Sequence, residues 1–87
     1  MEREYIEDKT FDKTDFAQYP PVKGEYENCR FIDCDFSKSD LSDLIFMECE
    51  FESCNLSMVK LTMTAFRDIK FRNCKMLGLQ FENCNKF

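Results

Sequence analysis

Six cysteines and seventeen acidic residues are the side chains of this 87-residue chain that could carry chemistry. Structural metal sites commonly pair cysteines that are separated by two residues and complete the set with histidine. Here "CRFIDC" and "CEFESC" place four residues between the thiols, and the chain has no histidine. We therefore predict no metal and no cofactor, and we interpret the cysteines as buried packing groups, a common role of free cysteine.

The acidic residues give no sign of a catalytic pair. Without histidine, the chain lacks the usual general base near neutral pH and any histidine-activated nucleophile. No two carboxylates are marked by their sequence context as enclosed or perturbed, as catalytic carboxylates would be. We expect no catalytic residues and no enzymatic activity.

A large apolar residue stands at every fifth position from Tyr26 to Phe81. Beyond Tyr26, the predicted structural core is Phe31, Phe36, Leu41, Phe46, Phe51, Leu56, Leu61, Phe66, Phe71, Met76 and Phe81. A five-residue step turns a helix by about 140° and moves a strand residue to the opposite face, so neither element keeps these side chains together. The chain must turn within every unit, which predicts a repeat architecture.

A second register supports the repeat. All six cysteines fall in one five-residue register, at positions that otherwise hold small or apolar residues, and all but Cys84 lie two residues before one of these apolar centres. The cysteines are Cys29, Cys34, Cys49, Cys54, Cys74 and Cys84. A narrow interior needs compact groups beside each large ring, and cysteine is a compact, usually buried side chain.

The units "CRFID", "CDFSK", "SDLSD", "CEFES" and "CNLSM" resemble the pentapeptide repeat family, densely over residues 24–85 and weakly over 4–16. The usual unit of that family is Ala/Cys/Ser, then Asp/Asn, then Leu/Phe, then two polar residues. The resemblance implies an all-β fold, a right-handed quadrilateral β-helix (pentapeptide-repeat solenoid) of about three to four coils. Each coil would hold four units, with a short strand on each side and a turn at each corner.

In such a solenoid each residue stacks on the residue 20 positions later. Two columns of centres are then wholly aromatic, which favours ladders of rings about 4.8 Å apart. These columns are Tyr26, Phe46 and Phe66, and Phe31, Phe51 and Phe71. Stacked cysteines such as Cys34 and Cys54 would have nearly parallel Cβ vectors, a poor geometry for a disulfide.

The N-terminal part is less regular. Ile6, Phe11 and Phe16 keep the five-residue phase, but "AQYPPVKGE" at 17–25 interrupts it with two prolines, which cannot donate to a strand ladder. We predict an N-terminal cap or partial coil with a proline-containing turn over residues 1–23, and the pentapeptide-repeat β-helix over 24–87. A disordered charged tail is the alternative for the first residues.

The C-terminal sequence "FENCNKF" has neither a polar capping repeat nor a recognisable terminal helix. A solenoid that stops there leaves an apolar face and open strand edges. We therefore expect either end-to-end self-association, for example a dimer, or continuation into a longer solenoid, in which case the β-helix is truncated at its C-terminus.

Residues 1–54 hold 15 acidic and 6 basic residues, whereas residues 55–87 hold 2 and 6. Rows of carboxylates on a narrow rod could imitate the phosphates of a duplex; the alternative is a solubilising surface. The candidate acidic partner-binding residues are Asp33, Asp35, Asp40, Asp43, Glu48, Glu50 and Glu52. The acidic balance argues against direct binding of nucleic acid. Met58 and Leu77 form a candidate apolar contact, unless further sequence covers them.

One branch of the family is especially similar. The quinolone-resistance and topoisomerase-poison immunity proteins share Cys- and Phe-rich units such as "CRFIDCDFSKSDLS" and "CNLSMVKL". That resemblance implies a non-enzymatic protein that binds DNA gyrase or topoisomerase IV and protects it from quinolone-type poisons, partly by DNA mimicry. Residues 24–81 lack the loop insertions of many such proteins, and their C-terminal dimer module is absent. The alternative is a structural or protein-interaction scaffold with no topoisomerase target.

The location of the protein is predicted from two absences in the sequence. No apolar run approaches 18 residues, and no charged-then-apolar leader occurs. We therefore expect a cytoplasmic protein that makes no membrane contact and keeps its thiols reduced.

Overall fold

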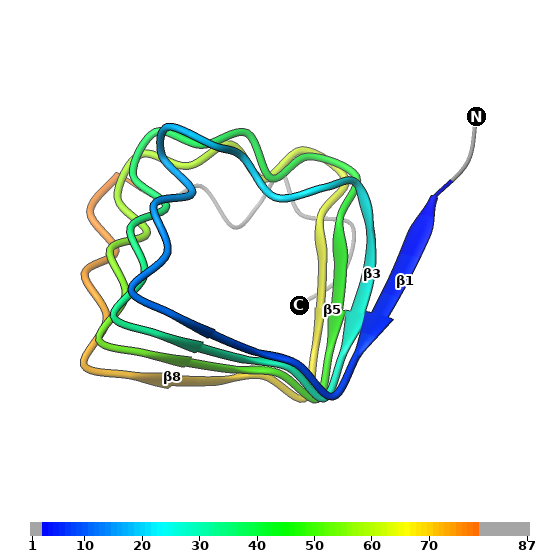
Figure 1. The fold of residues 1–87 in the computed structure, drawn as a ribbon. Helices are drawn as coiled ribbons and strands as arrows, with labels where there is room; N and C mark the ends of the chain where they lie inside the picture. Colours follow the sequence, from blue (N-terminus) through cyan, green and yellow to red (C-terminus); the bar gives the residue numbers. More distant parts are fainter. Residues whose placement is uncertain (1–2, 79–87) are drawn as a thin grey trace.

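The computed structural model describes residues 3–78, which form a β-solenoid (Figure 1). Two parallel sheets of four strands run along it, in the orders β1-β3-β5-β7 and β2-β4-β6-β8. The first sheet holds β1 (Glu4–Glu7), β3 (Gly24–Glu27), β5 (Ile45–Met47) and β7 (Ala65–Arg67). The second holds β2 (Thr10–Asp12), β4 (Arg30–Ile32), β6 (Glu50–Glu52) and β8 (Lys70–Arg72). Within residues 3–78 there is no helix that could span a membrane.

Every strand pairs with the strand 20 residues later. Phe31 lies opposite Phe51, and Phe51 lies opposite Phe71. The predicted pentapeptide-repeat β-helix and its 20-residue coil are therefore confirmed. We call the side that carries the first sheet side A and the side that carries the second sheet side B.

The other two sides correct one expectation, because they carry no strand in the described residues. Side C, centred on Phe16, Phe36, Leu56 and Met76, and side D, centred on Pro21, Leu41 and Leu61, are built from tight turns joined by isolated bridges. The turns close within one unit: the backbone N–H of Ser39 donates to the Phe36 carbonyl at 2.9 Å, and that of Thr64 donates to the Leu61 carbonyl at 3.1 Å. A four-residue turn leaves no extended run for a strand.

Corners of the coil place the backbone in the left-handed region at every fifth residue from Asp8 to Gly78, except at Gln18 and Lys23. The residues with positive φ are Asp8, Lys13, Asn28, Asp33, Lys38, Asp43, Glu48, Ser53, Met58, Met63, Asp68, Asn73 and Gly78. Seven of these thirteen described residues are Asp, Asn or Gly, the types that adopt this conformation most readily. The polar residue two places after each centre is thus partly a requirement of the corner.

Stacked aromatic rings fill the interior on sides A and B. The Phe31 and Phe51 rings are 4.8 Å apart and 8° from parallel, and the Tyr26 and Phe46 rings are 5.3 Å apart. Neighbouring columns meet edge to face, as Phe31 and Phe46 do at 5.9 Å. Both arrangements are favourable for aromatic pairs, so the ladders support each other.

The predicted core residues lie inside the coil over most of its length. Eight of them, from Phe31 to Phe66 in steps of five, are at most 4% exposed. Phe71 and Met76 are partly buried, and Phe81 lies outside the described residues.

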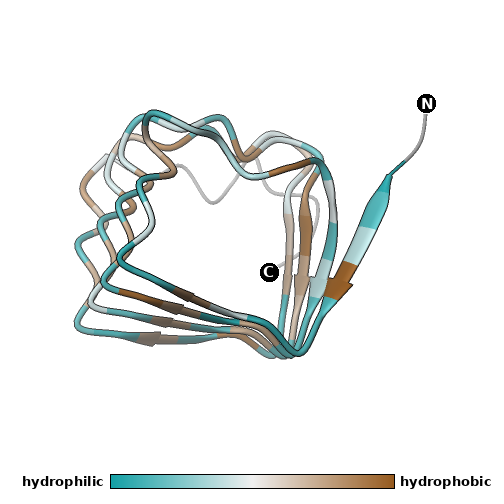
Figure 2. Cartoon of the chain, in the orientation of Figure 1, coloured by the Kyte–Doolittle hydropathy of each residue, from teal (hydrophilic) through white to brown (hydrophobic). Residues whose placement is uncertain are grey.

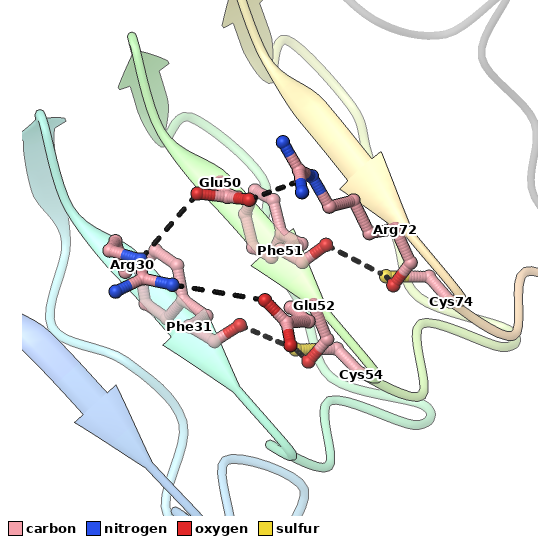
Figure 3. A network of polar contacts seen from close by, with 8 residues as sticks. All are labelled: Arg30, Phe31, Glu50, Phe51, Glu52, Cys54, Arg72 and Cys74. Atoms are coloured by element: carbon pink, nitrogen blue, oxygen red, sulfur yellow. Dashed lines mark hydrogen bonds and ion pairs between the residues drawn. The ribbon is translucent and has the colours of Figure 1, made fainter.

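The cysteines do more than pack. Each described thiol donates to the carbonyl oxygen of a residue 23 places earlier, as Cys54 Sγ does to Phe31 at 3.1 Å and Cys74 Sγ to Phe51 at 3.2 Å (Figure 3). Thr64 Oγ1 fills the same role toward Leu41 at 2.7 Å, and Ser39 Oγ toward Phe16 at 2.7 Å. The register therefore selects small side chains that carry a donor, because a buried carbonyl without a partner is costly.

Residues 4–23 form the first coil of the solenoid. β1 and β2 pair with β3 and β4, and Phe11 stacks on Phe31 at 5.0 Å. The segment 17–23 contains no strand. Pro21 is buried at the place of an apolar centre, whereas Tyr19 points outward and is 69% exposed. The prolines thus continue the coil without a ladder on side D.

Candidate protein-binding surface

Outward residues line up in columns because each coil repeats the one before it. Figure 2 shows hydrophilic and hydrophobic residues alternating along the strands, with β1 hydrophilic over most of its length. Since the interior is filled by its own side chains, binding chemistry must come from these outward columns. The charged residues are described below for the corners and for each side of the coil in turn.

Three of the seven predicted acidic residues occupy left-handed corners. Asp33, Asp43 and Glu48 have φ of 53°, 65° and 52° and are exposed. They lie at three different corners of the coil, so the structure does not bring them together.

Two more of the seven cap the turns of sides C and D. Asp35 Oδ1 accepts from the Ser37 backbone N–H at 2.9 Å, and Asp40 Oδ1 accepts from that of Ser42 at 2.9 Å. Hydrogen bonds from Ser42, first from its hydroxyl and then from its backbone, lower the pKa of Asp40. These carboxylates stabilise local turns in the way short acidic side chains commonly do.

The last two lie on side B among arginines. Glu50 accepts from Arg72 at 2.9 Å and lies 3.5 Å from Arg30, and Glu52 lies 3.8 Å from Arg30 (Figure 3). The network runs across β4, β6 and β8, with opposite charges on adjacent strands. Its carboxylates are neutralised within the chain.

Side A carries acidic residues that the sequence prediction missed. Counting residues 4–8 and their equivalents in later coils, this side and its corner hold seven acidic residues against one basic residue, Arg67. The acidic residues are Glu4, Glu7, Asp8, Glu25, Glu27, Glu48 and Asp68. Only Glu48 belonged to the predicted set. The 20-residue period was the available signal, since it places Glu7 directly beside Glu27.

Two polar contacts partly relieve the crowding on side A. The Tyr5 hydroxyl donates to Glu27, and this hydrogen bond raises the pKa of Tyr5 to about 12. Asn28 Nδ2 donates to Asp8 Oδ1 at 2.7 Å. Stacked like charges on paired strands cost stability, so the fold alone does not account for this side.

The structure brings together the two residues of the predicted apolar contact. The Met58 backbone N–H donates to the Leu77 carbonyl at 2.8 Å, and the two side chains are 57% and 64% exposed. The Met58 sulfur lies so close to Gly78 that a Cβ there would be 2.3 Å from it. The two side chains form a small exposed apolar spot at the C-terminal end of side C.

Residues 3–78 hold no candidate metal centre. They contain no cluster of three metal-ligating side chains, and their five cysteines are free thiols. The hydrogen bond between Cys34 and Cys54 lowers the pKa of Cys34 to about 7 and, together with burial, raises that of Cys54. Cys34 is only 2% exposed, so its thiol is shielded from reactants. Burial raises the pKa of Cys49 to about 11, so Cys49 and Cys54 stay protonated at neutral pH. A thiol that stays protonated at neutral pH is a poor nucleophile.

Comparison with known proteins agrees with this architecture. A sequence model described as the pentapeptide repeat region matches residues 25–86, more than two thirds of the chain. The chain belongs to the pentapeptide repeat family. No curated protein matches it at a significant level.

Solved structures of QnrB1, a plasmid-mediated fluoroquinolone resistance protein, share the fold of this pentapeptide repeat chain. The full-length QnrB1 structure is 24% identical over 82% of this chain, with a TM-score of 0.53. A trypsin-treated R167E form is 22% identical over 93% of the chain, with a TM-score of 0.67. The matches cover 43% and 49% of those QnrB1 chains, so this chain spans just under half of their length.

Proposed function

We propose that this pentapeptide repeat protein is a non-enzymatic binding rod whose partner is a type II topoisomerase, DNA gyrase or topoisomerase IV, which it protects from quinolone-type poisons. The observation that carries the proposal is the acidic side A, where carboxylates stand in columns on a rigid parallel sheet. The shared fold with QnrB1, a fluoroquinolone resistance protein, supports the choice of partner.

Side A supplies the chemistry of such a contact. A topoisomerase binds duplex DNA through basic surfaces that meet phosphates, and carboxylates on adjacent strands would meet the same basic side chains. Glu7 and Glu27 are held beside each other by strand pairing, and Glu48 and Asp68 follow at the adjoining corner. Complementary charge of this kind would guide the encounter and set the orientation of the partners.

Side A refines the mimicry hypothesis. Glu50 and Glu52 on side B form ion pairs, and Asp35 and Asp40 cap turns on sides C and D. These four would therefore contribute less to a partner than the stacked carboxylates of side A. The duplex carries one charge per about 1.7 Å, so these columns would imitate a short stretch of it.

The test is gyrase supercoiling in the presence of a fluoroquinolone, with the 87-residue chain titrated into the reaction. We expect supercoiling to be restored as the chain is added. The double variant Glu25→Gln with Glu48→Gln should need at least about tenfold more protein, because two side A charges are lost.

A variant matched in net charge provides the control. Val22→Lys with Thr62→Lys changes the net charge by the same two units, but both residues are exposed on side D. It should protect as well as the unmodified chain. No protection by the folded chain, together with no binding to gyrase, would overturn the proposal and favour the alternative, a protein-interaction scaffold with another partner.

A further inference from the structure

The two ends of the described solenoid carry opposite charge. Residues 4–23 hold five acidic and three basic residues, whereas residues 64–78 hold one acidic and four basic residues. The rod is therefore acidic at its N-terminal end and basic at its C-terminal end. Neither the fold nor the proposed topoisomerase contact requires this polarity.

The charges match column by column if a second copy continues the solenoid. In that register residues 4–16 of the second copy lie one level beyond residues 64–76 of the first. The oppositely charged pairs would be Glu7 with Arg67, Asp12 with Arg72 and Asp15 with Lys75. Asp8 over Asp68 would be the single like-charged pair among these residues.

The interior of the N-terminal end can accept another level of rings. A hollow of about 260 Å³ opens there, lined by apolar side chains that include Ile6, Phe11, Phe16 and Pro21. Phe11 stacks on Phe31 on its inner side at 5.0 Å. In the continued register Phe71 of the other copy would lie over Phe11 and extend the same ladder. Stacking would then bury apolar surface on both copies.

The backbone of the two ends can make the same contact through open strand edges. β2 is the first strand of the side B sheet and β8 is the last, and among the described residues no strand lies beyond either one. Open edges of parallel strands readily pair with another chain. Pairing of β2 on β8 would repeat the register that joins β4 to β6 and β6 to β8.

We infer that the partner for this end is a second copy of the chain, stacked head to tail, with β2 and Asp15 of one copy on β8 and Lys75 of the other. The contact is heterologous and leaves one free end of each kind, so it produces linear assemblies that lengthen with concentration. Because three exposed charge pairs contribute, the assemblies shorten as salt is raised. This inference is independent of the proposed function.

The test uses sedimentation velocity over a range of protein and salt concentrations. The N-end variant carries Asp12→Lys with Asp15→Lys, and the C-end variant carries Arg72→Glu with Lys75→Glu. Each variant alone should associate at least about tenfold more weakly than the unmodified chain. An equimolar mixture should recover assembly, since the intact basic end of the first variant meets the intact acidic end of the second.

Controls in the middle of the rod separate the ends from general charge effects. Asp35→Lys changes the column of Asp15 one coil further in, and Arg30→Glu changes a partner of Glu50, as Arg72→Glu does. Both controls should assemble as the unmodified chain does, with folding checked by circular dichroism. A chain that stays monomeric throughout overturns the inference. If the unmodified chain assembles but the equimolar mixture of the two variants does not, the inference is also overturned, and a head-to-head contact is favoured instead.

Discussion

The strand sides and the turn sides use the same kind of outward residue for different purposes. On sides C and D, Asp35 and Asp40 accept backbone hydrogen bonds that hold the turns. On side A, Glu7 and Glu27 lie on strands whose parallel ladder is made by the backbone alone. Polar side chains are thus required by the fold where the coil turns, and are available to a partner where it is extended.

The interiors of the sides differ in a parallel way. Sides A and B stack rings over most of the described rod, side C stacks only Phe16 on Phe36, and side D buries Leu41 and Leu61. Aromatic stacking adds to the area each ring buries, so the strand sides should hold most of the stability of the rod. The turn sides mainly close each coil.

The largest expected effect comes from replacing one buried centre on a strand side and one on a turn side and comparing the losses of stability. Phe31→Ala removes a fully buried ring that stacks on Phe11 and Phe51, and should lower the free energy of unfolding by about 3–5 kcal/mol. Leu41→Ala, equally buried on side D, should cost at least about 1 kcal/mol less, because it loses no ring pairs. Urea unfolding measures both, and equal costs would show that ring stacking adds nothing beyond burial.

The resemblance to the pentapeptide repeat family supplied the 20-residue coil and its columns, and the five-residue period was itself sufficient to predict the buried centres such as Phe36 and Phe46. It could do so because a strict period places each side chain without any knowledge of distant contacts. It could not reveal that the units around Leu41 and Leu61 fold as turns. A turn and a short strand both keep the centre inside, so the two give the same pattern.

The surface was harder to predict because the position of an acidic residue in the sequence does not show which groups its carboxylate contacts. Glu50 and Asp35 are both acidic residues that stand directly before an apolar centre, yet one pairs with Arg72 and the other caps a turn. Glu7 lies 20 residues before Glu27, so its role appears only once the first coil is recognised. The hydrogen bonds of the thiols were likewise not predicted, because the small size of the side chain was already a sufficient reason for a cysteine at position 54.

Alkaline pH should distinguish positions of the small-residue register that hold a thiol from those that hold a hydroxyl. Burial raises the pKa of Cys49 from 9.0 to about 11, so folding favours the protonated thiol. The resulting stability is present below pH 9 and is lost as pH rises from 9 through 11, by about 2–3 kcal/mol in all. Thermal unfolding followed across this range should show the loss.

Cys49→Ser is the matched variant, because its hydroxyl can still donate to the Tyr26 carbonyl that Cys49 Sγ contacts at 3.3 Å. It should lose less stability than the unmodified chain between pH 9 and 11. Tyr26, whose pKa burial raises to about 12, should then dominate above pH 10 in both proteins. Identical pH profiles would mean that the Cys49 thiol does not titrate with folding.

The smallest effects should separate a turn cap from an ion pair. Asp35→Ala removes the hydrogen bond to the Ser37 backbone on side C and should cost about 1 kcal/mol at any salt concentration, since a short local bond is little screened. Glu50→Gln keeps the shape of the side chain on side B and should cost about 0.5 kcal/mol at low salt and less as salt is raised. Urea unfolding at two ionic strengths measures both variants. If the Asp35 effect also faded with salt, its carboxylate would act through charge, and the distinction between turn sides and strand sides would fail at this position.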